Sequence, residues 1–162
     1  MNNIRAAVIG TGYLGRFHAQ KYAVAPGCTL VGVVDPRHEV REAVAAEMGT
    51  RGFADHRELL GKVDAVSVVT TTPAHYAIAR DFIEAGAHVL VEKPITETVE
   101  QAQSLIEIAA AAGRILQVGH LERFNPAIVA AEARLRGARF IECQRLAPFK
   151  ERGTDVNVVL DL

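Results

Sequence analysis

The chain has 162 residues, of which 49% are hydrophobic and 23% charged, and its formal net charge is −1. This length can bury one substantial core, and the composition is that of a globular protein rather than of a disordered or membrane-spanning one. The sequence shows no strongly basic surface, no apolar run of bilayer length and no signal peptide, so we expect a cytoplasmic protein without nucleic-acid or membrane partners. Cys28 and Cys143 lack the spacing of a metal or redox pair, so we expect no metal site.

Short apolar segments alternate with longer helical patterns over the first 120 residues. Strands are expected at Ile4–Ile9, Thr29–Val34, near Arg51–Phe53, and at Ala65–Val69, Ala87–Val91 and Ile115–Val118. Helices are expected at Tyr13–Ala25, His38–Met48, Ala74–Ala85 and Val99–Ala112. Strands without polar alternation are buried on both faces, as in a parallel sheet of βαβ units. With right-handed connections, the sequence predicts an α/β fold with a doubly wound Rossmann sheet over residues 1–120.

The pattern changes after Gly119. A helix is expected at Pro126–Arg136, with the proline in its first turn, and a strand at Arg139–Leu146. A further apolar run, Val156–Leu162, is where the sequence stops. We therefore expect residues 121–162 to be the truncated start of a second, C-terminal α/β domain, and the chain to be the N-terminal part of a longer protein.

The segment between the first strand and the first helix has a dinucleotide-binding pattern. It reads Gly10-Thr11-Gly12-Tyr13-Leu14-Gly15. Gly10 permits the tight turn, Gly12 lets the backbone approach a pyrophosphate, and Gly15 lets the helix pack closely on the sheet. Backbone N–H groups and the positive end of the helix dipole then hold the anion. Tyr13 and Leu14 are expected to border the same cofactor site.

Asp35 and Arg37, at the end of the second strand, bear on which nucleotide binds. Asp35 can accept hydrogen bonds from the adenosine ribose hydroxyls, and its charge would repel a 2′-phosphate, which favours NAD. Arg37 lies close enough to accommodate a phosphate, so NADP stays an alternative. The disfavoured interpretation is an unrelated α/β protein, in which the glycines serve only a turn and Asp35 caps a helix. His18, one turn into the helix, either lines the cofactor cleft or is a packed, hydrogen-bonded histidine.

Ligands of open α/β sheets bind beyond the carboxyl ends of the strands, so the loops after the fourth, fifth and sixth strands are candidates for the chemistry. They contain, in turn, Thr70, Thr71, Thr72, Pro73 and His75, then Glu92, Lys93 and Pro94, then the stretch Gly119–Pro126. The ammonium of Lys93 can hydrogen-bond a reacting oxygen and stabilise its developing charge. A lone lysine is more often a solvated surface residue, but the place of Lys93 between a strand end and a proline favours a functional role.

Four motifs together resemble the Gfo/Idh/MocA family of NAD(P)-dependent oxidoreductases, over the whole chain. They are the glycine fingerprint, the Thr-Pro loop, the Glu-Lys-Pro tripeptide and the segment around Asp161. The stretch Gly119–Pro126 further resembles family members that act on nucleotide-linked sugars. The resemblance implies hydride transfer between a sugar, nucleotide-sugar or polyol hydroxyl and the nicotinamide of NAD, by a homo-oligomeric full-length enzyme. It also implies that the second domain binds substrate, so we expect the chain alone to bind cofactor and to turn over no substrate.

The resemblance assigns a catalytic role to Lys93, which would contact the substrate hydroxyl near the nicotinamide, and to Asp161. Asp161 would precede, by one helical turn, a catalytic histidine that lies beyond Leu162. Glu92 would orient Lys93 or the nicotinamide ribose.

The remaining candidates are assigned to binding. Thr70 to Pro73 would form the loop under the cofactor, and His75 is grouped with this loop although its place is more typical of a helix start. Arg123 and Asn125 would contact polar groups of the substrate. A structural role is equally open for these two, because Asn125 can cap the following helix.

Two other functions stay open at this point. One is a non-catalytic, NAD-sensing regulatory protein on the same fold, since fold does not determine function. The other is an oxidoreductase of another substrate class, such as a bilin reductase or a dihydrodiol dehydrogenase. Lys93 and Asp161 favour an enzyme over a sensor.

Overall fold

The computed structural model describes residues 3–142 and residue 144. The chain divides into two units, Met1–Gly119 and His120–Leu162. Within the described residues, the strands all belong to the first unit. The second unit contains a 3₁₀ turn, η2 (Leu121–Phe124), followed by the helix α5 (Pro126–Leu135).

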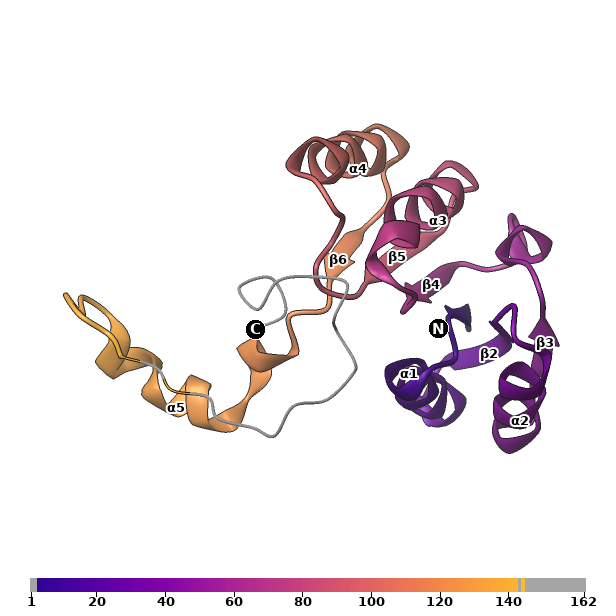
Figure 1. Ribbon diagram of the computed structural model, residues 1–162, viewed down its shortest axis with the longest axis horizontal. Helices are drawn as coiled ribbons and strands as arrows, with labels where there is room; N and C mark the ends of the chain where they lie inside the picture. Colours follow the sequence, from indigo (N-terminus) through magenta and orange to yellow (C-terminus); the bar gives the residue numbers. More distant parts are fainter. Residues whose placement is uncertain (1–2, 143, 145–162) are drawn as a thin grey trace. The chain divides into compact units, whose positions relative to one another are not determined.

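The first unit is built on a six-stranded sheet in which every neighbouring pair of strands is parallel. The strands are β1 (Ile4–Ile9), β2 (Cys28–Val34), β3 (Arg51–Phe53), β4 (Ala65–Val68), β5 (His88–Val91) and β6 (Leu116–Val118). Their order is β3-β2-β1-β4-β5-β6, so the chain starts in the middle, moves out to one edge and then builds the other half (Figure 1). This order confirms the doubly wound Rossmann sheet that the sequence predicts.

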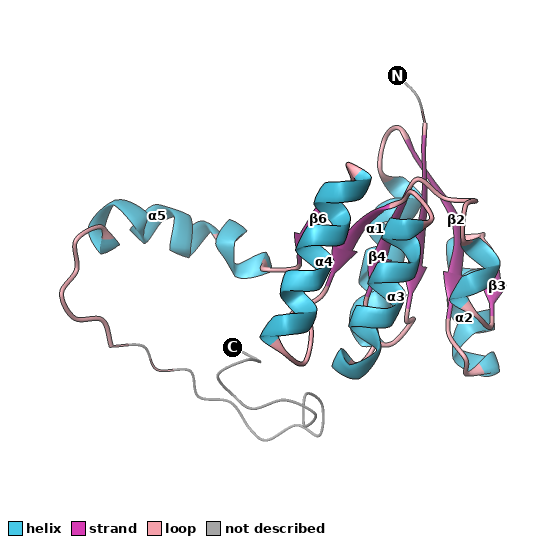
Figure 2. Cartoon of the chain, turned by 90° about the horizontal axis from the view of Figure 1, so that it is seen from above, coloured by secondary structure: helices cyan, strands magenta, loops and turns pink. Residues whose placement is uncertain are grey.

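Helices cover both faces of this sheet. They are α1 (Tyr13–Val24), α2 (His38–Met48), α3 (Thr72–Glu84) and α4 (Val99–Ala112). The pair α1 and α2 lies on one face and the pair α3 and α4 on the other (Figure 1), and all four run alongside the strands (Figure 2). Right-handed crossovers require this arrangement, because the chain moves in opposite directions from β1 in the two halves of the sheet.

The core lies on both sides of the sheet because successive strand residues point to opposite faces. On one face, Val8 packs in a cluster with Ala19 of α1 and Val44 of α2. On the other face, Val66 belongs to a larger cluster with Phe82 of α3. Two packed faces explain why the strands carry hardly any polar alternation.

The helix and strand boundaries of the first unit agree closely with the predictions. The exception is α3, which begins at Thr72 rather than at Ala74. Pro73 fits within the first turn, where its missing N–H has no helical partner to lose. At their other ends, α2 and α4 stop at Gly49 and Gly113, whose φ angles of 63° and 62° lie in the left-handed region that glycine adopts most readily.

One expected strand, Arg139–Leu146, does not form within the described residues. Residues 139–142 and 144 of this segment carry no strand. A strand needs a neighbour for its backbone hydrogen bonds, and in the part of the chain that the structure describes no strand pairs with this segment. Cys143, Asp161 and the apolar run Val156–Leu162 lie outside the described residues.

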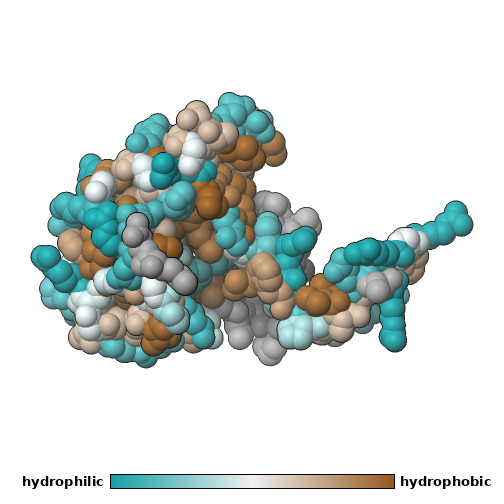
Figure 3. Space-filling model, turned by 180° about the vertical axis from the view of Figure 1, so that it is seen from behind, coloured by the Kyte–Doolittle hydropathy of each residue, from teal (hydrophilic) through white to brown (hydrophobic). Residues whose placement is uncertain are grey.

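Apolar side chains remain on the surface in scattered patches, which are brown in Figure 3. The most exposed large ones in the first unit are Tyr13, Val24, Val99 and Ile115. Over residues 3–142 and 144, no helix combines the length and the apolar character needed to cross a bilayer.

A short 3₁₀ turn, η1 (His56–Leu59), precedes β4 and was not expected from the sequence. It begins with a capping box. The Asp55 carboxylate accepts a hydrogen bond from the backbone N–H of Arg57 at 2.9 Å, and Glu58 Oε1 accepts one from the backbone N–H of Asp55 at 3.3 Å. This reciprocal bonding satisfies the free N–H groups at the start of the turn.

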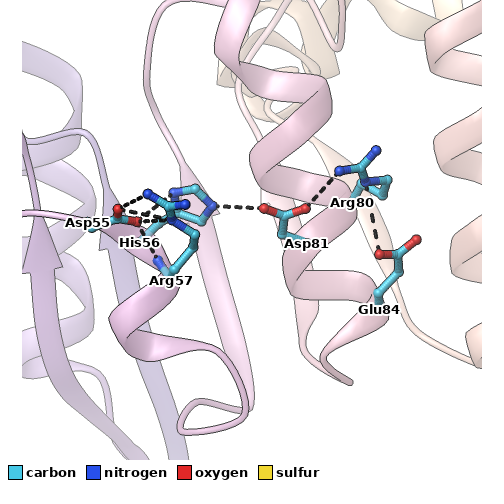
Figure 4. Close-up of polar contacts among 6 residues, drawn as sticks. All are labelled: Asp55, His56, Arg57, Arg80, Asp81 and Glu84. Carbon is cyan, nitrogen blue, oxygen red and sulfur yellow. Dashed lines mark hydrogen bonds and ion pairs between the residues drawn. The ribbon is translucent and has the colours of Figure 1, made fainter.

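The carboxylate of Asp81 ties η1 to α3 (Figure 4). Its Oδ2 lies 3.1 Å from His56 Nε2, and its Oδ1 accepts a hydrogen bond of 3.1 Å from Arg80 Nη2. Burial by itself would raise the pKa of Asp81, but the hydrogen bonds from His56 and Arg80 outweigh it, so the pKa is lowered. The ionised carboxylate therefore stabilises the contact between the turn and the helix.

We expect Asp81→Asn to lower the free energy of unfolding by about 1 kcal/mol near pH 5. Because the pKa of Asp81 is depressed in the folded protein, its stabilisation is present above the ordinary carboxyl pKa and is lost as the pH falls through the folded value. Urea unfolding should therefore separate wild type from the variant near pH 5 and bring them together on strong acidification. The control is Glu84→Gln, whose Oε2 lies 4.0 Å from Arg80 Nε on the exposed side of α3. A difference that persists undiminished in acid would contradict this account.

Candidate functional site

The parallel sheet brings the carboxyl ends of five strands to one row. Ile9 is in register with Val34 and with Val68, and Val68 with Val91, which is in register with Val118. The residues that follow this row are Gly10, Asp35, Val69, Glu92 and Gly119. The glycine loop, the acidic residue and the Glu-Lys-Pro tripeptide therefore share one edge of the sheet, as the sequence predicts from strand order.

Gly10 and Gly15 are required by the backbone itself. Gly10 has a φ of +91°, and a Cβ added there would lie 2.5 Å from the carbonyl oxygen of Val69. A Cβ on Gly15 would lie 1.8 Å from the carbonyl oxygen of Gly10, because α1 crosses directly over the turn. These contacts are the tight turn and the close helix packing that the fingerprint predicts.

Gly12 is different, because nothing in the protein requires it. An added Cβ would meet no atom within 4 Å, and the φ of −65° suits any residue. Gly12 is also the N-cap of α1, which has no side-chain cap and no acidic residue in its first turn. Open space beside an uncapped helix N-terminus fits a pyrophosphate, since N–H groups there point outward and the helix dipole favours an anion.

Asp35 is held by hydrogen bonds on both carboxylate oxygens. Oδ1 accepts from the backbone N–H and Nε of Arg37 at 3.0 and 2.9 Å, and Oδ2 accepts from Nη2 of Arg37 at 2.9 Å. Thr11 donates to Oδ2 from its backbone N–H and its hydroxyl, both at 3.1 Å. Although Asp35 is only 3% exposed and burial would raise its pKa, these bonds outweigh burial and lower the pKa to about 2. The group is thus an anion at any physiological pH.

A hollow of about 720 Å³ borders the glycine loop. Its lining includes Thr11, Gly12, Tyr13 and Arg37, and it continues between α1 and α2. Tyr13 is exposed and makes an edge-to-face contact with Phe17, with ring centroids 5.2 Å apart. Leu14 is half-buried. The fingerprint residues thus lie beside open space large enough for part of a nucleotide.

The loop after β4 has an exposed and a buried side. Thr71 and Pro73 are exposed, Thr70 is half-buried and Thr72 is buried. His75 is 1% exposed, and its ring nitrogens lie 2.9 Å from the carbonyl oxygen of Pro94 and 3.1 Å from that of Thr70. Both nitrogens therefore face backbone carbonyls, so we correct the grouping of His75 with the cofactor ligands and assign it to joining two loops.

The Glu-Lys-Pro tripeptide combines a buried carboxylate with a half-buried lysine. Glu92 is 5% exposed; its Oε1 lies 3.1 Å from His18 Nε2 and its Oε2 accepts a bond of 3.3 Å from the backbone N–H of Lys93. Burial would raise the pKa of Glu92, but His18 and Lys93 outweigh it and lower the pKa. This geometry supports the prediction that Glu92 orients Lys93, while a contact of Glu92 with the nicotinamide ribose stays a prediction.

Sequence reasoning left the partners of His18 undecided, and it missed Ser67 and Tyr22. His18 Nδ1 lies 3.1 Å from Ser67 Oγ, which is 2.6 Å from Tyr22 Oη. The available signal was Ser67 itself, a polar residue within the apolar strand β4. Of the two readings of His18, the hydrogen-bonded histidine is the one that the structure supports.

The second unit contains Arg123 and Asn125. Asn125 caps α5, with Oδ1 accepting from the backbone N–H of Ala127 at 2.9 Å, and its Nδ2 donates to Glu122 at 2.8 Å. Its capping role is therefore confirmed, while a substrate contact for Arg123 or Asn125 stays a prediction. Within residues 3–142 and 144, no three His, Cys, Asp or Glu side chains gather as metal ligands would.

Comparison with known proteins gives the same picture for residues 4–120, which match the sequence model of the oxidoreductase family with an NAD-binding Rossmann fold. UDP-N-acetylglucosamine 3-dehydrogenase from Acidithiobacillus ferrooxidans is 45% identical over 100% of this chain and 51% of its own length. Its crystal structure superimposes with a TM-score of 0.89, covering 99% of this chain and 53% of that one at 46% identity.

Two further relatives lie at lower identity. The scyllo-inositol 2-dehydrogenase (NAD(+)) of Bacillus subtilis is 37% identical over 83% of this chain and 40% of its own length. GenD2 from gentamicin A biosynthesis, solved in complex with NAD, has a TM-score of 0.81 at 31% identity, covering 85% of this chain and 40% of that one. The chain thus spans about half the length of the relatives it matches, or less.

The family match covers the glycine loop, Asp35 and the Glu-Lys-Pro tripeptide, which are the parts of the sheet edge that the geometry brings together. The open space at Gly12 and the anionic Asp35 fit the dinucleotide that the family binds. The chain belongs to the Gfo/Idh/MocA family of oxidoreductases, and its first unit is the NAD-binding Rossmann domain of that family.

Proposed function

We propose that this chain is the cofactor-binding part of an NAD-dependent dehydrogenase that oxidises a hydroxyl of a sugar, nucleotide sugar or polyol. The observation that carries the proposal is the row of strand ends, which places the glycine loop, Asp35 and Lys93 on one edge of the sheet. Relatives with names in this substrate class, including UDP-N-acetylglucosamine 3-dehydrogenase, support it.

The cofactor would be held at three places. The N–H groups at the start of α1 would bind the pyrophosphate beside Gly12, and Asp35 would accept from the adenosine ribose. The exposed part of the loop after β4, with Thr71 and Pro73, would border the remaining half. When bound, the nicotinamide supplies the hydride acceptor, which is the part of the chemistry that protein side chains cannot provide.

Lys93 would act on the substrate hydroxyl. Its ammonium can donate a hydrogen bond to the reacting oxygen and stabilise the negative charge that develops as the proton leaves. The buried, ionised carboxylate of Glu92 accepts a hydrogen bond from the backbone N–H of Lys93 and so restrains the backbone there.

The second unit would begin the substrate domain. We propose that Arg123 and Asn125 meet polar groups of the substrate and that Asp161 is a further catalytic residue of the longer protein. The substrate domain of the longer protein would also supply the contacts of a homo-oligomer.

The test is an assay of a protein that carries this chain together with the C-terminal half that its relatives have. We expect NADH formation with UDP-sugars, free sugars or inositols as substrates, and none from the 162-residue chain, which should still bind NADH. Tight NADH binding without turnover on any of these substrates would instead identify a nucleotide sensor, and the absence of NADH binding would overturn the proposal altogether.

Asp35→Ser should shift the cofactor preference from NAD toward NADP by about 100-fold. The change removes the charge that repels a 2′-phosphate and releases Arg37, which donates two side-chain bonds to Asp35, so that it can pair with that phosphate. Fluorescence titration with NADH and NADPH measures the ratio. Asp64→Ser is the matched control, because Asp64 pairs with Arg5 in the same two-bond manner at the amino ends of β1 and β4, opposite the edge that carries Asp35. An unchanged ratio in Asp35→Ser would rule out the assigned role.

A further inference from the structure

A network of hydrogen-bonded side chains extends from α1 across β4 to the loop after β5. Tyr22 and His18, one helical turn apart on α1, both contact Ser67 Oγ, at 2.6 and 3.1 Å. The other ring nitrogen of His18 lies 3.1 Å from Glu92 Oε1. Four groups from three segments of the chain are thus linked under the sheet edge that carries Lys93.

The chemistry of Glu92 and Tyr22 sets the direction of their hydrogen bonds. Glu92 has a lowered pKa and is ionised, so its carboxylate can only accept, and His18 must donate from Nε2. The other ring nitrogen, Nδ1, is left to bond with the Ser67 hydroxyl, which can accept or donate as the ring requires. Burial raises the pKa of Tyr22, so its phenol stays protonated and donates to Ser67 Oγ. Every polar group of this network has a hydrogen-bond partner in this arrangement, which makes the network rigid.

Ser67, His18 and Glu92 are also the residue types of a nucleophilic triad, but the geometry excludes that chemistry. Ser67 is 0% exposed in the middle of β4, so no substrate carbonyl can reach its oxygen. Nucleophilic catalysis needs an accessible hydroxyl. The group therefore acts on the structure of the edge rather than on a substrate.

The last residue of this network, Glu92, directly precedes Lys93 in the sequence. Glu92 Oε2 accepts from the backbone N–H of Lys93, while the carbonyl of Pro94 on the other side faces His75. Gly119 closes the remaining side, since a Cβ there would lie 2.5 Å from Glu92 Oε1. The residues before and after Lys93 are thus each held by a histidine, Glu92 by the part-buried His18 and Pro94 by the buried His75.

We propose that His18 is a positioning residue for Lys93, acting through the Glu92 carboxylate and locked by Ser67 and Tyr22. The proposal rests on the proposed function, in which Lys93 is the group that meets the substrate. Because His18 belongs to α1, whose first turn would hold the pyrophosphate, it links the cofactor-binding helix to the catalytic loop. Productive placement of Lys93 thus depends on the same helix that binds the cofactor.

The test compares His18→Leu, which removes the donor, with His18→Gln, whose amide can still donate to Glu92. Trace acetylation of the 162-residue chain, followed by mass spectrometry, reports the reactivity of the Lys93 amine. We expect the rate in His18→Leu to rise by about tenfold, the equivalent of one lost hydrogen bond to a charged group. His18→Gln should restore most of the wild-type value. Gln20→Leu, on the same helix but bonded to Glu47, is the control for a general effect on α1 and should not change the rate.

If His18→Leu fails to fold, Gly119→Ala displaces the same carboxylate from the opposite side and should raise the Lys93 rate equally. The ring proton is a separate readout: nitrogen-edited NMR should find a His18 proton on Nε2. Unchanged Lys93 reactivity in both variants, or an Nε2 without a proton, overturns the proposal. NADH titration of the wild type separates failure of this proposal from failure of the proposed function. If the wild type binds no NADH but the variants still change the reactivity of Lys93, only the proposed dehydrogenase function is contradicted.

Discussion

Replacement of Lys93 by alanine should lower kcat/KM of the longer enzyme by about 10²- to 10⁴-fold, while the Kd for NADH changes by no more than about threefold. Lys93 follows the buried Glu92 at the end of β5, and its backbone is held by that carboxylate. Its ammonium can stabilise charge that develops on the reacting oxygen, an interaction that is made mainly in the transition state. Loss of such an interaction lowers kcat more than it weakens ground-state binding.

The measurement is steady-state kinetics on the best substrate of the screen, with NADH titration in parallel. Lys62→Ala is the control, because Lys62 is an exposed lysine in the loop that leads into the amino end of β4, whereas Lys93 follows the carboxyl end of β5. A Lys93→Ala enzyme that keeps wild-type kcat would remove Lys93 from the catalytic group. Equal loss of turnover and of NADH binding would instead make Lys93 a cofactor ligand.

Gly12→Ala should abolish most NADH binding, by about 100-fold or more, in a protein that folds as wild type does. The added methyl group meets no protein atom within 4 Å, and the backbone angles at Gly12 are open to alanine. The space it fills is the approach to the N–H groups of α1, so the methyl would hold the pyrophosphate away from its donors. Calorimetry measures the loss of NADH affinity, and thermal unfolding checks that the variant is as stable as wild type.

Gly15→Ala provides the contrast. Its methyl group would lie 1.8 Å from the carbonyl oxygen of Gly10, so α1 must move off the sheet. We expect a loss of stability of about 3 kcal/mol or more, or no folded protein. If Gly12→Ala were as unstable as Gly15→Ala, or bound NADH normally, the assignment of open space at Gly12 to the pyrophosphate would be wrong.

Local pattern was sufficient for the elements of the first unit and for the row of candidate residues. Short apolar runs without alternation, set between helical patterns, are typical of strands buried on both faces, and their parallel order places every following loop on one edge. For this reason Asp35 and Lys93 could be assigned to the same edge before any contact was known. The strand expected at Arg139–Leu146 does not form in residues 139–142 and 144, because a strand needs another strand to bond with, and none of the described strands pairs with this segment.

The sequence by itself thus determined the Rossmann sheet, the glycine loop and the family. Only the tertiary structure decided which side chains meet: that Arg37 clasps Asp35, that His75 joins two loops instead of facing a ligand, and that His18 holds Glu92. Periodicity and spacing report which face of an element is buried, since neighbours along the chain share that pattern. The contact between His18 of α1 and Glu92, which follows β5, joins residues 74 positions apart, and such partners are selected by packing, which no local pattern encodes.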